Sequence, residues 1–332
     1  MKKLHLTTWL FSALLLFTAC EADDNDKLPS GNSGGGGEKA GSGALTVTNG
    51  TSTDQTNKNK NVTGNDNLDT RYEIPHIIGG SDNYILVRST TAYGINYIIE
   101  WNNTKKAQRW TAFQMYNGNS GTSWKRDYWA GYVDSNEWVA KNYTDYGFYD
   151  PFQPDPDLPT NVRTELSQYK SSSYQRGHIV ASQDRVNSKD ANEQTFYLSN
   201  IMPQSKALNT GTWQNMESQV RKWNDNSYRE TLYVVKGGTI DDNHITTEKW
   251  SGLTVPDYFF MGIVSKLGNK YRGIAFILEH SNPSKNGSLL KNYVFTIDQL
   301  EQLTGIDFFC NLPDDIEDEM EKSVDRTFWG MN

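Results

Sequence analysis

The sequence predicts an α+β fold: a mostly antiparallel sheet with a few helices, in one globular domain over residues 70–332. Short apolar and β-branched runs bounded by turn residues recur from Arg71 onward, which is typical of paired strands. One later segment has helical spacing, and no internal repeat of fixed period is present. Aromatic residues make up 12% of the 332 residues, enough to fill a core.

The first segment, residues 1–20, is predicted to be a lipoprotein signal peptide. Lys2 and Lys3 precede a mostly apolar run, which ends in the small residues Thr18 and Ala19 before Cys20. We expect Cys20 to carry lipid and to attach the protein to a membrane; an ordinary signal peptide with a chance cysteine is the alternative. Cys310 is then the only other cysteine, so no intramolecular disulfide is expected.

Residues 21–69 are predicted to form a flexible, low-complexity tether. Acidic residues lead into four consecutive glycines at 34–37 and a tract of Ser, Thr, Asn and Gly with few apolar side chains. The acidic start resembles the surface-export signal of some Gram-negative lipoproteins. This resemblance implies a cell-envelope lipoprotein of the outer membrane, displayed at the surface.

The strands are predicted from six apolar runs of the remaining chain. These are 84–88, 97–100, 111–116, 231–235, 258–264 and 271–278. Asn117-Gly118 predicts a turn after the third.

Two helices are predicted, over residues 212–224 and 296–303. In the first, Trp213, Met216, Val220 and Trp223 fall at i, i+3, i+7 and i+10 and form one buried stripe. The second ends before Gly305, a common stop signal. No transmembrane run is predicted after the signal segment.

Charge is unevenly distributed along the chain. The net charge is −8, yet residues 161–232 carry nine basic against seven acidic side chains, and residues 311–325 carry seven acidic against one basic. This argues against tight coating of nucleic acid but permits an enzyme that releases its product.

The chemistry-bearing residues are concentrated in one segment. Tyr174-Gln175-Arg176-Gly177-His178 is followed by Leu198-Ser199-Asn200-Ile201-Met202-Pro203-Gln204, and then by Asn209, Trp213, Glu217 and Arg221. A base for water, a neutral oxygen ligand for a hard cation and guanidinium groups for phosphate charge are the components of phosphodiester hydrolysis. The other four histidines show no ligand-like pairing, so zinc is not expected.

Each candidate also has a purely structural interpretation. A lone His178 is more often structural, although Gly177 could expose its imidazole through a tight strand-to-loop backbone. Asn209 could be the N-cap of the first helix rather than a metal ligand. Glu217 and Arg221 could form a simple i,i+4 salt bridge.

The combined spacing resembles that of the DNA/RNA non-specific endonucleases, the ββα-metal nucleases. The resemblance covers residues from about Arg71 to the C-terminus and implies a ββα-metal finger as the catalytic module. It also implies metal-dependent hydrolysis of DNA and RNA with little sequence selectivity, using Mg²⁺, with Mn²⁺ as the second choice. Nucleic acid is then the partner, besides the membrane at Cys20.

By this resemblance, His178 is the general base and Asn209 holds the metal. Glu217 orients a metal-bound water, and Asn200 supports the His178 site by hydrogen bonding. Arg176, Arg221 and, on a looser alignment, Arg126 stabilise the negative charge of the substrate phosphate.

One position departs from the family: Gln175 stands where its members usually have aspartate, which puts activity or metal preference in question. The principal alternative is a surface-anchored lipoprotein that binds nucleic acid or glycan without turnover. A nuclease with a narrower target, used in processing or against other bacteria, is the second.

Overall fold

The computed structural model describes residues 42–129, 151–170, 173–246, 250–281 and 287–332. All of them belong to a single compact unit. The predicted signal peptide, the predicted lipidation site at Cys20 and the first part of the predicted tether lie outside these ranges.

Eight strands of the described chain form one sheet, and every neighbouring pair is antiparallel. In spatial order they are β1 (Gly43–Leu45), β2 (Asn83–Thr90), β3 (Gly94–Asn102), β4 (Ala107–Met115), β7 (Thr231–Gly238), β8 (Tyr258–Leu267), β9 (Lys270–Glu279) and β10 (Val294–Phe295). The six predicted strands correspond to β2, β3, β4, β7, β8 and β9. The α+β prediction is confirmed.

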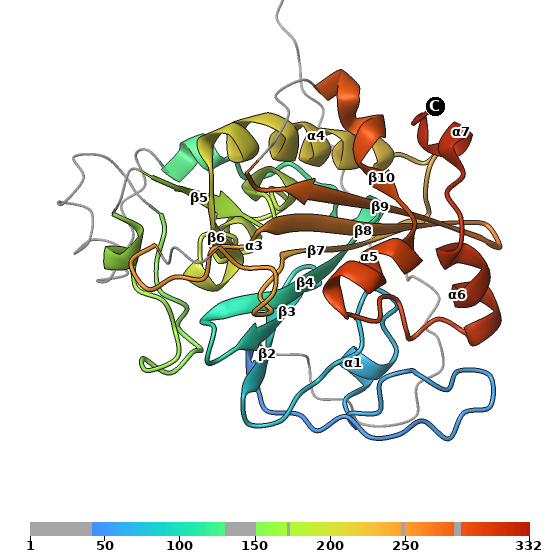
Figure 1. Ribbon diagram of the computed structural model, residues 1–332, viewed down its shortest axis with the longest axis horizontal. Helices are drawn as coiled ribbons and strands as arrows, with labels where there is room; N and C mark the ends of the chain where they lie inside the picture. The colour runs from blue at the N-terminus through green and yellow to red at the C-terminus, as the bar shows by residue number, and fades with distance from the viewer. Residues whose placement is uncertain (1–41, 130–150, 171–172, 247–249, 282–286) are drawn as a thin grey trace, which may run out of the picture. The chain divides into compact units, whose positions relative to one another are not determined.

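Helices cover both faces of this sheet (Figure 1). They are α1 (Asp66–Asp69), α3 (Lys189–Gln194), α4 (Gln214–Trp223), α5 (Ile297–Thr304), α6 (Asp314–Glu321) and α7 (Arg326–Trp329). The predicted second helix is α5, with Thr296 as its N-cap and Gly305 as its C-cap at φ 62°. Among the described residues, no helix is long and apolar enough to cross a membrane.

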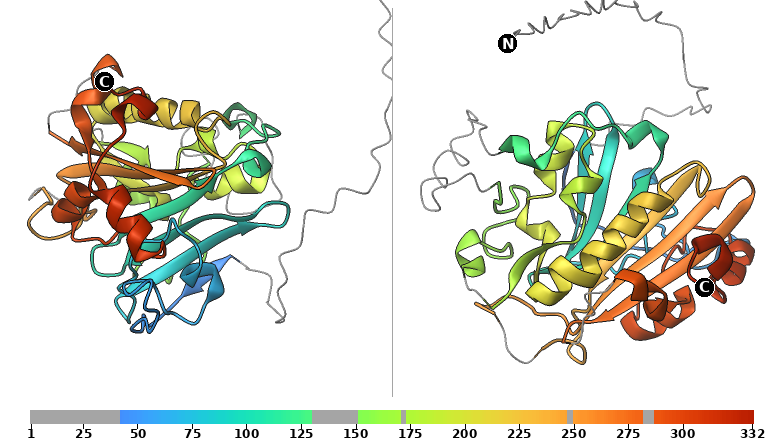
Figure 2. Two further views of the ribbon diagram at one scale, coloured as in Figure 1. Left: turned by 90° about the vertical axis from the view of Figure 1, so that its right-hand side faces the viewer. Right: turned by 90° about the horizontal axis from the view of Figure 1, so that it is seen from above.

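Two separate cores hold the layers together. The apolar stripe of α4 packs on one face of the sheet, against Phe259, Met261 and Ile263 of β8. The intervening residues Phe260 and Val264 face the opposite core, which α1, α5 and α6 cover. Since each large apolar side chain contributes about 1.5–3 kcal/mol on full burial, the alternation fixes the register of the central strands. Figure 2 shows α4, in yellow, lying across the sheet.

The predicted boundary of the tether is wrong for its second part. Within 21–69, β1 pairs with β2, and α1 contributes the buried Leu68. Hydrogen bonds of asparagine side chains also attach this segment to the domain. Asn57 Nδ2 donates to Leu312 O at 2.6 Å, and the backbone N–H of Asn61 donates to Asn311 Oδ1 at 2.9 Å. The scarcity of apolar residues predicts a flexible segment, but buried hydrogen bonds hold this part of the chain on the domain.

Candidate active site

The chemistry-bearing segment folds into a ββα finger beside the main sheet (Figure 1). β5 (Gln175–His178) pairs antiparallel with β6 (Ile201–Gln204), which places His178 opposite Ile201. A π-helical segment, η6 (Leu208–Trp213), then leads into α4. Trp213 Nε1 donates to His178 O at 3.0 Å, so the helical part of the finger is tied directly to the strand that carries the histidine.

Gly177 is required by close packing rather than by an unusual backbone. A Cβ at this position would lie 2.2 Å from Cδ and Oε1 of Gln204, whose side chain is fully buried. The expected strand-to-loop turn is therefore not its reason: Gly177 lies inside β5, and a Cβ there would force the buried Gln204 side chain of β6 to move.

The imidazole of His178 lies between aromatic rings and two guanidinium groups. Its centroid is 5.3 Å from that of Phe152 and 5.1 Å from that of Phe196. Arg176 Cζ lies 4.1 Å from the Phe152 ring centroid, and Arg126 Cζ lies 5.4 Å from that of Phe196. The structure thus brings Arg126, Arg176 and His178 together.

This environment keeps the imidazole neutral. Burial lowers the pKa of His178 well below 6.5, and the charges of Arg126 and Arg176 lower it further. Nε2 is buried and has no hydrogen-bond partner among the described residues. A neutral imidazole can accept a proton, so this nitrogen is suited to activate a water.

Asn209 is not a helix N-cap. It lies inside η6, where its N–H donates to Ser205 O at 2.9 Å, while the Ser205 hydroxyl accepts from Leu208 N–H at 3.3 Å. Its side-chain Nδ2 instead donates to Gln175 Oε1 at 2.8 Å. This bond leaves Asn209 Oδ1 without a donor among the described residues, and an amide oxygen is a suitable ligand for a hard cation.

The helix after Asn209 starts later than predicted because η6 is irregular. Gly211 has non-helical angles, φ −122° and ψ −112°, so regular α-helix begins only at Gln214. Such π-helical insertions are frequent at functional sites. The irregularity sets the angle between the turn that carries Asn209 and the helix that carries Glu217.

Arg221 does not form the i,i+4 salt bridge with Glu217 considered above. Its Nη1 lies 2.8 Å from Asp184 Oδ1, while the other oxygen of Asp184 lies 3.4 Å from the Nζ of buried Lys236. Burial raises the pKa of Glu217 to about 7; Asp184 raises it as well, while Lys236 and Arg221 oppose this rise. Sequence reasoning missed Asp184 and Lys236, since neither belongs to the motif.

Asn200 stabilises the backbone that follows His178. Its Oδ1 accepts from Val180 N–H at 2.9 Å, and its Nδ2 donates to Thr195 O at 2.8 Å. The preceding residue, Ser199, donates to Asp155. Both motif residues are fully buried, so they position the strand rather than offer a group to a substrate.

A second histidine, which sequence reasoning passed over, fixes the start of η6. His280 Nε2 accepts from Ser205 N–H at 2.7 Å, and Nδ1 donates to Pro256 O at 2.8 Å. Burial lowers the pKa of His280, in agreement with this neutral form. It is 75 residues from Ser205, so no local pattern could have revealed it.

Comparison with known proteins decides the family. The family model described as DNA/RNA non-specific endonuclease matches residues 84–315. The chain belongs to this family. A nuclease of Nostoc sp. is 31% identical over 253 residues, which cover 74% of this chain and 80% of the relative. Nuclease C1 of Cunninghamella echinulata is 27% identical over 65% of this chain and 81% of its own length.

The fold is also found among solved structures. A chain in the crystal structure of the EndoG/EndoGI complex has a TM-score of 0.54 and 18% identity, covering 69% of this chain and 88% of that one. This DNA/RNA non-specific endonuclease is therefore a hydrolase that acts on nucleic acid and depends on a divalent metal ion. Its ββα finger is the part of the fold that carries the family motif.

Proposed function

We propose that this endonuclease cleaves DNA and RNA with His178 as the general base and Asn209 as the protein ligand of Mg²⁺, with Mn²⁺ as a substitute. The observation that carries the proposal is the unpartnered Nε2 of a neutral imidazole beside two guanidinium groups. His178 removes a proton from water, and the resulting hydroxide attacks phosphorus while the bond from phosphorus to the 3′-oxygen breaks; the 3′-oxygen leaves and takes up a proton from solvent. Arg176 and Arg126 bind the phosphate and offset its developing charge.

The environment of Asn209 fits a hard cation. Mg²⁺ dehydrates reluctantly, so one amide oxygen together with substrate phosphate and retained waters is a sufficient ligand set. When bound, the ion supplies charge stabilisation for the phosphate and the leaving oxygen. The Gln175 amide holds Asn209 by its Nδ2 and thereby directs Oδ1 toward the site. Gln175 stands where the family usually has aspartate, and it accepts this hydrogen bond without carrying a charge.

The acidic and basic groups of α4 complete the proposed site. Glu217 accepts a hydrogen bond from a water in the site and so helps to orient it. Arg221, held by Asp184, adds positive charge on the substrate side. Asn200 acts indirectly, because its bonds with Val180 and Thr195 fix the backbone next to His178.

We further propose that the enzyme is a cell-envelope lipoprotein, anchored in the outer membrane through Cys20 and displayed at the surface. The support is the sequence of residues 1–26: a charged start, an apolar run, small residues before the cysteine and acidic residues after it. An exposed nuclease would act on nucleic acid outside the cell.

A binding lipoprotein without turnover is the alternative function, and Gln175 is the residue that favours it. Degradation of plasmid DNA and of structured RNA by the purified protein distinguishes the two. We expect cleavage of both with Mg²⁺, none with EDTA, and recovery when Mg²⁺ is returned in excess. Binding without cleavage under all metal conditions would establish the alternative.

A further inference from the structure

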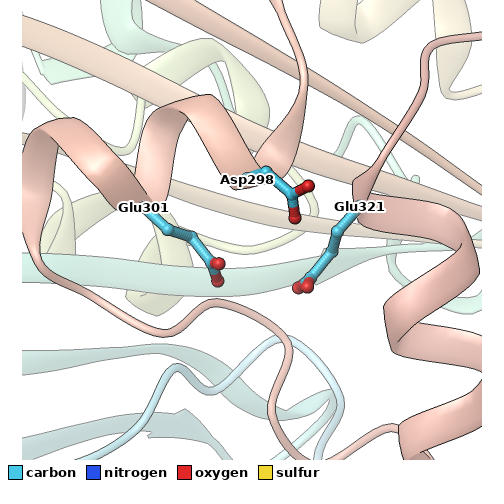
Figure 3. A group of neighbouring side chains, drawn as sticks. All are labelled: Asp298, Glu301 and Glu321. Atoms are coloured by element: carbon cyan, nitrogen blue, oxygen red, sulfur yellow. The ribbon is translucent and has the colours of Figure 1, made fainter.

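A second cluster of acidic side chains lies away from the finger, between two C-terminal helices. Asp298 and Glu301 come from α5 and Glu321 from the last residue of α6. One carboxylate oxygen from each lies within 4.8 Å of the other two. Figure 3 shows all three carboxylates turned toward the space between the helices.

Glu321 is the member whose carboxylate is buried without a partner. It is 7% exposed, and its Oε1 is buried without a hydrogen-bond partner among the described residues. Burying a carboxylate oxygen without a donor costs several kcal/mol when the group is ionised. A proton or a bound cation would remove this cost.

Nothing in the described protein neutralises the cluster. Within the described ranges, none of the three carboxylates forms an ion pair with a lysine, arginine or histidine. Two further acids, Asp307 and Glu317, lie close enough to influence Glu321. Burial raises the pKa of Glu321 to about 10, and the neighbouring carboxylates raise it too.

We propose that Asp298, Glu301 and Glu321 bind a hard divalent cation, Ca²⁺ in preference to Mg²⁺. One oxygen from each carboxylate lies within 4.8 Å of the other two, so a single ion can contact all three, and calcium accepts several carboxylates in flexible geometry. Magnesium demands near-ideal octahedral order and is usually bound through one or two carboxylates, so a site of three carboxylates favours calcium. Glu301 Oε1 already accepts from Phe308 N–H at 2.7 Å, which leaves its second oxygen for the ion.

This ion would connect α5 with α6. Both helices pack on the face of the sheet opposite α4, through Ile297, Leu300 and Met320. The cation site is therefore structural and separate from the metal that Asn209 holds. Binding would stabilise the folded state, since the unfolded chain does not bring the three carboxylates together.

Calcium binding is measured on the full chain carrying Asn209→Ala, so that the finger does not contribute its own metal site. After removal of divalent ions, calorimetric titration with CaCl₂ should show one site. At calcium a hundredfold above Kd, the melting temperature should rise by about 5 °C or more. No heat and no rise in melting temperature would overturn the proposal.

Three variants in the same background locate the site. Glu321→Gln and Asp298→Asn should each abolish the calcium response or weaken binding at least tenfold. Glu319→Gln removes the same charge from the exposed face of α6 and should leave the response unchanged. Without calcium, Glu321→Gln should melt at or above the temperature of its parent, because a neutral amide replaces a buried carboxyl group that has no partner. Undiminished binding in both Glu321→Gln and Asp298→Asn, or its loss in Glu319→Gln, would exclude this site.

Discussion

At the scale of single residues, the properties of His178 come from its neighbours. Two aromatic rings pack against the imidazole, and two arginines oppose its protonation. In the proposed mechanism the same arginines bind the phosphate. One arrangement would then keep the proposed base neutral and attract the substrate.

The pH dependence of kcat/KM follows from this environment. Because the pKa of His178 is lowered, the imidazole is neutral above that pKa, and its contribution to activity is lost as pH falls through it. The Glu217 carboxyl, whose pKa burial raises to about 7, titrates in the same range, so the profile is measured in Glu217→Gln at saturating Mg²⁺. In that variant we expect the acidic limb to lie below pH 6.5. A limb centred above pH 7 would show that the arginines do not act on the base as described.

Replacement of Asn209 tests the proposed metal ligand. Asn209→Asp introduces a carboxylate toward Gln175, whose amide can rotate to donate instead, so the fold should remain while the Mg²⁺ concentration for half-maximal rate changes. Asn209→Ala should remove most activity and cost about 1 kcal/mol of stability through the lost hydrogen bond. Rates across a Mg²⁺ titration and melting curves measure both effects. An unaltered titration in Asn209→Asp would remove Asn209 from the metal site.

At the scale of elements, the finger depends on the contact between β5 and β6. Gly177 lets the buried side chain of Gln204 lie against β5, and Trp213 fastens the helix to the same strand. The position of His178 is thus set by three elements that lie up to 35 residues apart in sequence.

Gly177→Ala should destabilise the protein by about 1–3 kcal/mol and reduce activity, since its Cβ would overlap Gln204. Gly177→Ala with Gln204→Ala should recover part of that stability by removing the overlapping atoms. Gly43→Ala serves as the control, because nothing lies within 4 Å of a Cβ there. Chemical denaturation measures all three. Equal stability of Gly177→Ala and the parent would contradict the packing argument.

The sequence predicted the strands and α4 well because their signals are local. Alternating apolar runs and the 213–223 stripe reflect burial against one sheet. The sequence could not predict three hydrogen bonds, because tertiary folding brings their partners together. These bonds join Asp184 with Arg221, His280 with Ser205, and Gln175 with Asn209. The motif identified the candidate site residues, but only the structure distinguished the capping interpretation of Asn209 from its bond with Gln175.

At the scale of the whole molecule, a polar segment completes the domain. Asn57 and Asn61 join residues near the start of the described chain to Leu312 and Asn311 near its end. The two ends of the fold thus stabilise each other through buried amides, which a composition-based boundary does not detect.

The proposed membrane attachment depends on Cys20, in the part of the chain before this domain. Cys20→Ser should move the protein from the membrane to the soluble fraction and leave its nuclease rate unchanged, since the lipid contributes nothing to the finger. Fractionation with the parent protein alongside measures the shift. A Cys20→Ser protein that still sediments with membranes would refute the lipoprotein proposal.

The most direct test of the central claim is the single-turnover cleavage rate of His178→Ala in Mg²⁺. Loss of the base should lower this rate by about 10²–10⁴-fold while nucleic-acid binding is retained, because proton transfer and not substrate contact is removed. His76→Ala, in a segment that packs on the other face of the sheet, should keep the parent rate. Retention of more than about a tenth of the parent rate in His178→Ala would contradict its role as general base.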